Sequence, residues 1–268
     1  MPEFAPALLA GYFALGLTTG FVAGLLGVGG GLIIVPVLIV MLHALGLAAG
    51  MEPQLALGTS LAAIVFTSLS SVRAHHRHGA VEWTVVRRIA LGVLAGTFVG
   101  ALLAARVPAT VLKAFFVLFL FYAAIQMWLD FKPAPHRAMP GRAGTTLAGT
   151  AIGAVSSWVG IGGGTLSVPF MLFHNIPLHR AIGTSAAIGF PIALAGAAGY
   201  IVGGLHATGL PAGSLGFVYL PALAGIVAGS VLTAPLGART SHRLPVRRLK
   251  RIFALLLLLL AIRMLWTF

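Results

Sequence analysis

Two clusters of glycine are the residues of this sequence best suited to hold a ligand, because successive glycines expose backbone N–H groups on tight turns. They are Gly27-Val-Gly-Gly-Gly31 and Gly160-Ile-Gly-Gly-Gly164. A helix that begins directly after such a turn directs the positive end of its dipole at the turn, which favours an anion. The candidate binding residues are Gly27, Gly29, Gly30, Gly31, Gly160, Gly162, Gly163 and Gly164.

Hydroxyl side chains form a second duplicated motif. Gly58-Thr59-Ser60 matches Gly183-Thr184-Ser185, and Ser157 lies just before the second glycine cluster. We expect Thr59, Ser60, Ser157, Thr184 and Ser185 to orient the same anion. The alternative is that each hydroxyl satisfies a backbone group of its own or a neighbouring helix.

Other glycines have a simpler explanation, which is close packing of helices. They recur every fourth residue, a spacing that lets two backbones approach. We assign this role to Gly16, Gly20, Gly24, Gly92, Gly96, Gly100, Gly225 and Gly229.

The remaining chemistry is restricted by what the chain contains. The four acids Glu3, Glu52, Glu82 and Asp130 fall in loops or at segment ends, which argues against a cation pathway through buried carboxylates. There is no cysteine, no Ser/His/Asp arrangement and no HExxH motif, so we expect no enzyme, no metal site and no cofactor. The tract His75-His-Arg-His78 is interpreted as a solvated basic loop. A proton-coupling role for His174 stays open.

The composition of the chain indicates that these residues lie in a membrane protein. The chain has 268 residues, 59% of them hydrophobic and 8% charged, and a mean hydropathy of +1.04, values typical of an all-α integral membrane protein. A nucleic-acid partner is not expected, since no soluble domain could carry the net charge of +13. Ten apolar segments are predicted: 5–26, 30–47, 56–74, 89–105, 109–130, 145–160, 164–178, 181–203, 217–238 and 252–267.

The motifs recur in the same order in two halves. Residues 1–135 form a first predicted membrane repeat, 136–144 a cytoplasmic connector, and 145–268 a second repeat, all within one membrane domain. No polar loop separates the first two segments of either half, so 5–47 and 145–178 are each interpreted as one broken, re-entrant hairpin. Two full crossings are the alternative. Each repeat then has about four helices and an odd number of crossings, so the two repeats have inverted topologies.

Basic residues support this arrangement. Fourteen of the 17 lysines and arginines fall in loops 73–88, 132–142, 177–182 and 239–251, which the topology places on one side of the membrane. The positive-inside rule makes that side cytoplasmic, so both termini are expected outside.

The duplicated motifs resemble those of the TauE/SafE family, the sulfite exporter or 4-toluenesulfonate uptake permeases. The resemblance rests on the glycine turns that end in Pro36 and Pro169, on the paired Gly-Thr-Ser motifs, on the basic loop before Gly79 and Trp83, and on the Pro and Leu-Lys residues that open the last helix of each half. It implies a bacterial or plant-type membrane transporter of sulfur-containing anions, and we expect its location to be a bacterial inner membrane. It also implies a bent first helix in each half and a site at the glycine turns and the Thr-Ser pairs. The insert 203–216 departs from the pattern and is interpreted as an outer gate or as a simple loop.

The function predicted from these observations is a secondary transporter of sulfite, sulfoacetate or another organosulfonate, working as an exporter by alternating access. The alternatives are an uptake permease for a sulfonate or another oxyanion, an anion channel, and a membrane subunit that transports nothing. The expected partners are the small anion and the lipid bilayer. Coupling to protons or other ions and the oligomeric state are left open by the sequence.

Overall fold

The computed structural model describes residues 6–27, 29–129, 138–241 and 246–266, and these ranges contain ten helices and one small sheet. Each predicted apolar segment forms a helix, so the ten-segment prediction is confirmed. The elements are α1 (Pro6–Leu26), α2 (Gly31–Ala44), α3 (Glu52–Arg77), α4 (Trp83–Ala104), α5 (Ala109–Leu129), α6 (Arg142–Val159), α7 (Gly164–Phe173), α8 (Leu178–Gly204), β1 (Ser214–Leu215), β2 (Val218–Tyr219), α9 (Leu220–Ser241) and α10 (Val246–Leu265).

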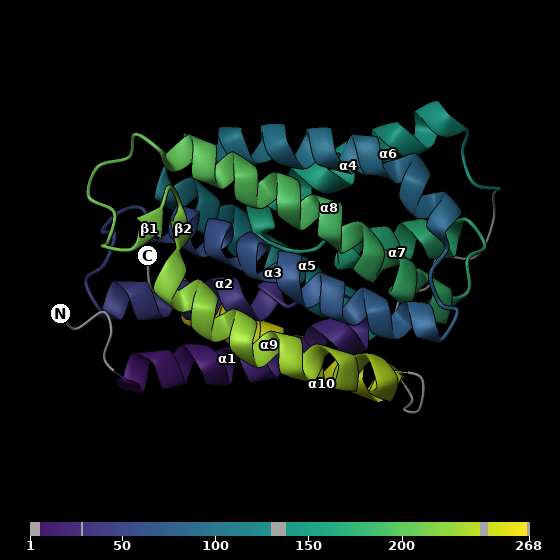
Figure 1. The fold of residues 1–268 in the computed structure, drawn as a ribbon, viewed down its shortest axis with the longest axis horizontal. Coiled ribbons are helices and arrows are strands. Elements are labelled where there is room, and N and C mark those ends of the chain that lie inside the picture. Colours follow the sequence, from purple (N-terminus) through teal and green to yellow (C-terminus); the bar gives the residue numbers. More distant parts are fainter. Residues whose placement is uncertain (1–5, 28, 130–137, 242–245, 267–268) are drawn as a thin grey trace.

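The helices lie roughly along one axis, as a bundle (Figure 1). Among the described residues, α1, α3, α4, α5, α8 and α9 are long and apolar enough to cross a membrane, whereas α2 and α7 are shorter apolar helices. Long apolar helices on the outside of such a bundle, with residues such as Leu91 and Leu118 largely exposed, require a lipid environment. The protein is therefore a multi-pass membrane protein.

The chain reverses direction at the first glycine cluster. A β-carbon on Gly11, early in α1, would lie 3.7 Å from Cε of Met41, late in α2, so the start of one helix lies beside the end of the other. The two arms are unequal, because α1 has 21 residues and is about 31 Å long at 1.5 Å per residue, whereas α2 has 14. By length and composition α1 could cross a membrane, whereas α2 is shorter, and the interpretation of the pair as a re-entrant hairpin stays a prediction.

Glycine stripes bring helices from the two halves of the chain into backbone contact. A β-carbon on Gly16 or Gly24 of α1 would collide with the carbonyls of Ile226 or Ala234 in α9. Gly92 and Gly96 of α4 are pressed in the same way against Thr146 and Thr150 of α6. The packing role predicted for these stripes is confirmed.

The sheet was not predicted. β1 and β2 form an antiparallel pair of two residues each, within and just after the glycine-rich insert. Phe217 between them is buried, and its N–H donates to the carbonyl of Tyr200 at 3.2 Å. The segment thus packs on α8 and leads directly into α9.

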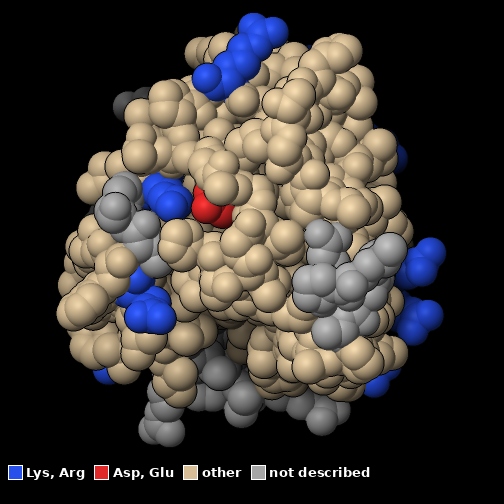
Figure 2. Space-filling view, turned by 90° about the vertical axis from the view of Figure 1, so that its left-hand side faces the viewer, with Lys and Arg blue, Asp and Glu red and all other residues tan. Residues whose placement is uncertain are grey.

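Charge is unevenly distributed between the two ends of the bundle. The C-terminal ends of α3 and α9 and the start of α4 lie at the end opposite β1 and β2, and they carry Arg73, Arg77, Arg87, Arg88 and Arg239 (Figure 1). The β1–β2 end shows mostly uncharged residues with scattered Lys and Arg (Figure 2). Some of the charged residues that the sequence analysis assigns to loops or segment ends lie outside the described residues: Glu3, Asp130, Lys132, Arg137 and Arg243.

The glycine stripe of α1 provides a matched stability test. Gly24→Ala places a methyl group against the Ala234 carbonyl, whereas Gly11→Ala, in the same helix, meets only the end of the Met41 side chain. We expect Gly24→Ala to lower the free energy of unfolding by about 1–3 kcal/mol through overpacking. Thermal unfolding of the purified protein in detergent measures the difference, and equal melting of the two variants would refute the packing role.

Candidate functional site

The two glycine clusters meet inside the bundle. A β-carbon on Gly29 would lie 2.9 Å from the backbone nitrogen of Gly162, and one on Gly31 would collide with the carbonyl of Gly160. Gly29 also lies beside Ile64 and Gly162 lies beside Gly189, near the midpoints of α3 and α8. The two glycine turns are therefore in contact with each other, and both lie beside the middle of α3 and α8, the two longest helices.

Backbone conformation explains why these positions are glycine. The φ angles are 68° at Gly27, 85° at Gly29, 78° at Gly30, 68° at Gly160 and 76° at Gly163, all in the left-handed region that L side chains rarely adopt. Even a residue that tolerated this conformation would have no space for its β-carbon at Gly29. Both the conformation and the close approach of the backbones require glycine.

Two serines join each turn to a helix from the other half of the chain. Ser60 Oγ donates to the carbonyl of Gly160 at 2.8 Å, and Ser185 Oγ donates to the carbonyl of Gly27 at 3.0 Å. Ser185 Oγ also accepts a hydrogen bond from Ser167 Oγ at 3.0 Å. The two bonds are reciprocal, because each Gly-Thr-Ser motif holds the glycine turn of the opposite half.

The neighbouring threonines form a second reciprocal pair. Thr59 Oγ1 accepts a hydrogen bond from the N–H of Tyr219 at 2.9 Å, and Thr184 Oγ1 accepts one from the N–H of Glu82, also at 2.9 Å. Thr59 Oγ1 donates in turn to the carbonyl of Leu55. These hydroxyls hold the segments that lead into α9 and α4. In this conformation all four motif hydroxyls bond to protein backbone, as the alternative interpretation of the sequence states.

A small cavity lies beside the glycine contact. Its volume is about 10 Å³, close to the minimum for one water molecule. Four of the predicted residues line it, Gly27, Gly29, Gly162 and Ser185. The other predicted residues, Gly30, Gly31, Thr59, Ser60, Ser157, Gly160, Gly163, Gly164 and Thr184, lie outside its lining.

Ser157 does not line the cavity. Its side chain is fully buried, and Oγ donates to the carbonyl of Ala154 in its own helix at 2.7 Å. The carbonyl of Ser157 accepts a hydrogen bond from the hydroxyl of Tyr200 at 3.0 Å. In this conformation Ser157 stabilises the packing of α6 and α8.

Three hydroxyl residues that the sequence analysis missed also line the cavity: Thr67, Ser68 and Ser71 of α3. With Ser60 and Ile64 they occupy positions i, i+4, i+7, i+8 and i+11, which is one face of a helix. This spacing could have identified them from the sequence. Ser71 is 2% exposed, and its Oγ has no hydrogen-bond partner among the described residues, which leaves it available to a ligand.

Electrostatics around the turns favour negative charge. The helices α2 and α7 begin directly after Gly30 and Gly163, and neither helix has a side-chain cap on its first N–H groups. The two described acids lie elsewhere: Glu82 pairs with Arg180 at 2.6 Å, and Glu52 lies 3.5 Å from His43. Uncapped helix N-termini, hydroxyls and no acidic side chain in the cavity lining suit an anion.

These features define a class of protein, a multi-pass membrane protein with two helix breaks in contact at its core. Comparison with known sequences identifies the family. The sulfite exporter TauE/SafE family matches residues 12–264, so the chain belongs to this family.

Similar proteins in other organisms are named as probable membrane transporters. The chain is 38% identical to a probable membrane transporter protein of Haemophilus influenzae over 252 residues, 93% of this chain and 95% of the relative. It is 28% identical to the probable membrane transporter protein YunE of Bacillus subtilis, over 94% of this chain and 95% of the relative. These are names of transporters rather than enzymes. No solved structure matches the chain.

The reciprocal serine bonds can be tested through stability. We expect Ser60→Ala and Ser185→Ala each to lower the free energy of unfolding by about 1–3 kcal/mol, because each leaves a buried glycine carbonyl without its donor. The matched control is Ser157→Ala, also a fully buried serine, whose hydroxyl bonds only to its own helix. Thermal unfolding in detergent compares the three variants, and a loss in Ser157→Ala as large as in the others would contradict the assignment.

Proposed function

We propose that the protein is a secondary transporter that moves small sulfur-containing anions, such as sulfite, sulfoacetate or another organosulfonate, out of the cell by alternating access. The observation that carries the proposal is the contact between two uncapped glycine turns beside a hydroxyl-lined cavity that no described acid lines. Backbone N–H groups and hydroxyls bind the oxygens of a sulfite or sulfonate group without a buried cation. The family's description as a sulfite exporter agrees with this chemistry.

We propose that the two halves, 1–135 and 145–268, are inverted repeats joined by the connector 136–144. The support is that contacts occur in matched pairs. Ser60 with Gly160 corresponds to Ser185 with Gly27, and Thr59 with Tyr219 corresponds to Thr184 with Glu82. The packing of α1 on α9 corresponds likewise to that of α6 on α4.

Alternating access follows from this symmetry. A cavity of about 10 Å³ is too small for sulfite, so the conformation described here does not accommodate the anion. Opening toward either side requires α3 and α8 to separate from the glycine turns. In our proposal the Ser60–Gly160 bond breaks on one side and the Ser185–Gly27 bond on the other. The freed hydroxyl and turn then contact the anion, which gives the motif serines a role in both closure and binding.

We place the basic end in the cytoplasm of a bacterial cell and both termini outside the inner membrane. The arginines of α3, α4 and α9 at that end support this orientation through the positive-inside rule. A membrane potential that is negative inside favours the exit of an anion by about 2.3 kcal/mol per charge for each 100 mV. Export therefore needs no coupling ion, whereas uptake does, and no described acid lines the cavity to bind one.

Transport in liposomes tests the proposed function. Purified protein in vesicles loaded with sulfite should take up labelled sulfite by counterflow, and the rate should saturate with concentration. A channel would show flux without counterflow. Failure to move sulfite, sulfoacetate and a panel of other sulfonates would refute the proposal.

Substitution of Ser71, whose hydroxyl has no hydrogen-bond partner among the described residues, tests the proposed anion-binding site. Ser71→Ala removes no hydrogen bond to the described protein, so we expect unchanged thermal stability. If Ser71 contacts the anion, the apparent KM for counterflow should rise by about tenfold or more, since a hydrogen bond to a charged group contributes about 1.5–3 kcal/mol. Ser157→Ala, whose hydroxyl bonds within its own helix, should leave the KM unchanged. Equal KM values for Ser71→Ala and Ser157→Ala would show that Ser71 does not contact the anion.

A further inference from the structure

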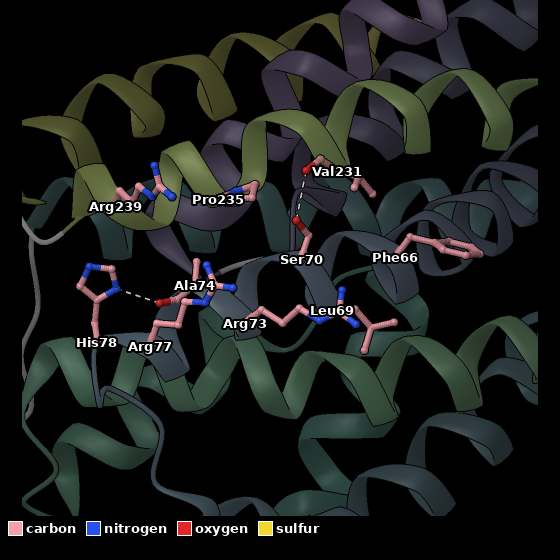
Figure 3. A pocket seen from close by; sticks show the side chains of 10 residues that line it. All are labelled: Phe66, Leu69, Ser70, Arg73, Ala74, Arg77, His78, Val231, Pro235 and Arg239. Carbon is pink, nitrogen blue, oxygen red and sulfur yellow. Dashed lines mark hydrogen bonds between the residues drawn. The ribbon is translucent and has the colours of Figure 1, made fainter.

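A second and much larger cavity lies on the outside of the bundle, between α3 and α9 at its basic end (Figure 3). Its volume is about 410 Å³, against about 10 Å³ for the cavity at the glycine turns. We call it the α3–α9 groove. It is lined by Phe66, Leu69, Ser70, Arg73, Ala74, Arg77, His78, Val231, Pro235 and Arg239.

The groove is apolar along one part and cationic along the other. Phe66, Leu69 and Val231 are 47%, 41% and 38% exposed, within the range of the other apolar side chains on the outside of the bundle, so this part of the groove is apolar and faces outward. Arg73 lies seven residues beyond Phe66 and Arg77 lies eleven beyond it, about 10 and 16 Å further along α3. The groove thus changes from apolar to cationic in the direction of the basic end.

The cations come from both walls. Arg73 and Arg77 extend from α3, Arg73 toward Leu69, and Arg239 extends from the last turn of α9 on the opposite wall (Figure 3). None of the three has a carboxylate partner among the described residues, where Glu82 is paired with Arg180 and Glu52 lies near His43. Three guanidinium groups that line one groove carry the same charge, and a bound anionic group would offset their mutual repulsion.

The groove is closed toward the centre of the protein. Thr67 Oγ1 and Ser230 Oγ are hydrogen-bonded at 2.7 Å, and Ser70 Oγ donates to the carbonyl of Val231 at 3.1 Å. These bonds tie α3 to α9: Thr67 belongs to the lining of the cavity at the glycine turns, and Ser70 and Val231 belong to the lining of the groove. A ligand in the groove therefore arrives from the side of the bundle, which in a membrane protein is the bilayer.

We propose that the α3–α9 groove binds an anionic phospholipid. The headgroup phosphate lies between Arg73, Arg77 and Arg239, where planar guanidinium groups form paired hydrogen bonds to its oxygens. An acyl chain lies along Phe66, Leu69 and Val231. The order of the groove, cationic at the membrane surface and apolar toward its interior, matches the order of a phospholipid.

The positive-inside rule alone explains arginines at this end, but it does not explain a concave site. Arg87 and Arg88 of α4 lie at the same end and are exposed, yet neither lines the groove. They provide the matched control, since their replacement removes positive charge from the same end and leaves the groove intact.

The experiment is a lipid titration of the purified, intact protein in a neutral detergent, followed by mass spectrometry of the folded complex. The probes are dioleoylphosphatidylglycerol, dioleoylphosphatidylcholine and inorganic phosphate. We expect phosphatidylglycerol to bind at least tenfold more tightly than phosphatidylcholine. Combined Arg73→Gln, Arg77→Gln and Arg239→Gln should reduce its affinity by about tenfold or more, and Arg87→Gln with Arg88→Gln should change it by less than twofold.

A second variant tests the apolar part. Leu69→Trp fills the groove from an exposed position, so the protein should remain folded, and it should weaken binding of phosphatidylglycerol while all three arginines are present. Three results would overturn the proposal: equal affinity for the two lipids, equal losses in the groove and control variants, or displacement of the lipid by inorganic phosphate at equal concentration. The last result would identify a site for small anions instead.

Discussion

The structure depends on backbone-to-backbone contact between two glycine turns inside a membrane protein. Backbone groups that leave a helix at membrane depth must find partners within the protein, because lipid provides none. Here the carbonyls of Gly27 and Gly160 find them in Ser185 and Ser60, each supplied by the other half of the chain. A side chain at Gly29 would separate the two turns, so the absence of a β-carbon is the condition for the arrangement.

The same condition explains how the surrounding helices pair. Since the turns must meet, the helices that carry them, α1 and α6, pack against α9 and α4 from the opposite half, and glycine stripes allow that closeness. Each glycine turn is therefore bonded to a serine from the opposite half of the chain. Helices from the first and second halves of the chain therefore interleave in the bundle.

Much of this arrangement could be predicted from the sequence. The ten helices follow from apolar segments of suitable length, and the glycine turns follow from their duplication, because strong periodic signals report local structure. The partner of each hydroxyl could not be predicted: Ser60 and Gly160 are 100 residues apart, and only packing brings them together. Thr67, Ser68 and Ser71 were missed because they have no counterpart in the second half, although their spacing on one helix face was visible. The β1–β2 pair was missed because two-residue strands leave no pattern.

The reciprocal bonds also affect how the protein is made. Gly27 is synthesised 158 residues before Ser185, the residue that satisfies its carbonyl. At about 5–20 residues per second, the first turn waits about 8–30 s for its partner. During that interval the carbonyl of Gly27 lacks the donor that it has in the folded protein. Until then the Gly27 carbonyl must bond to another group or remain without a partner. A chain truncated before Ser185 would leave this carbonyl permanently without the hydroxyl that bonds to it in the folded protein.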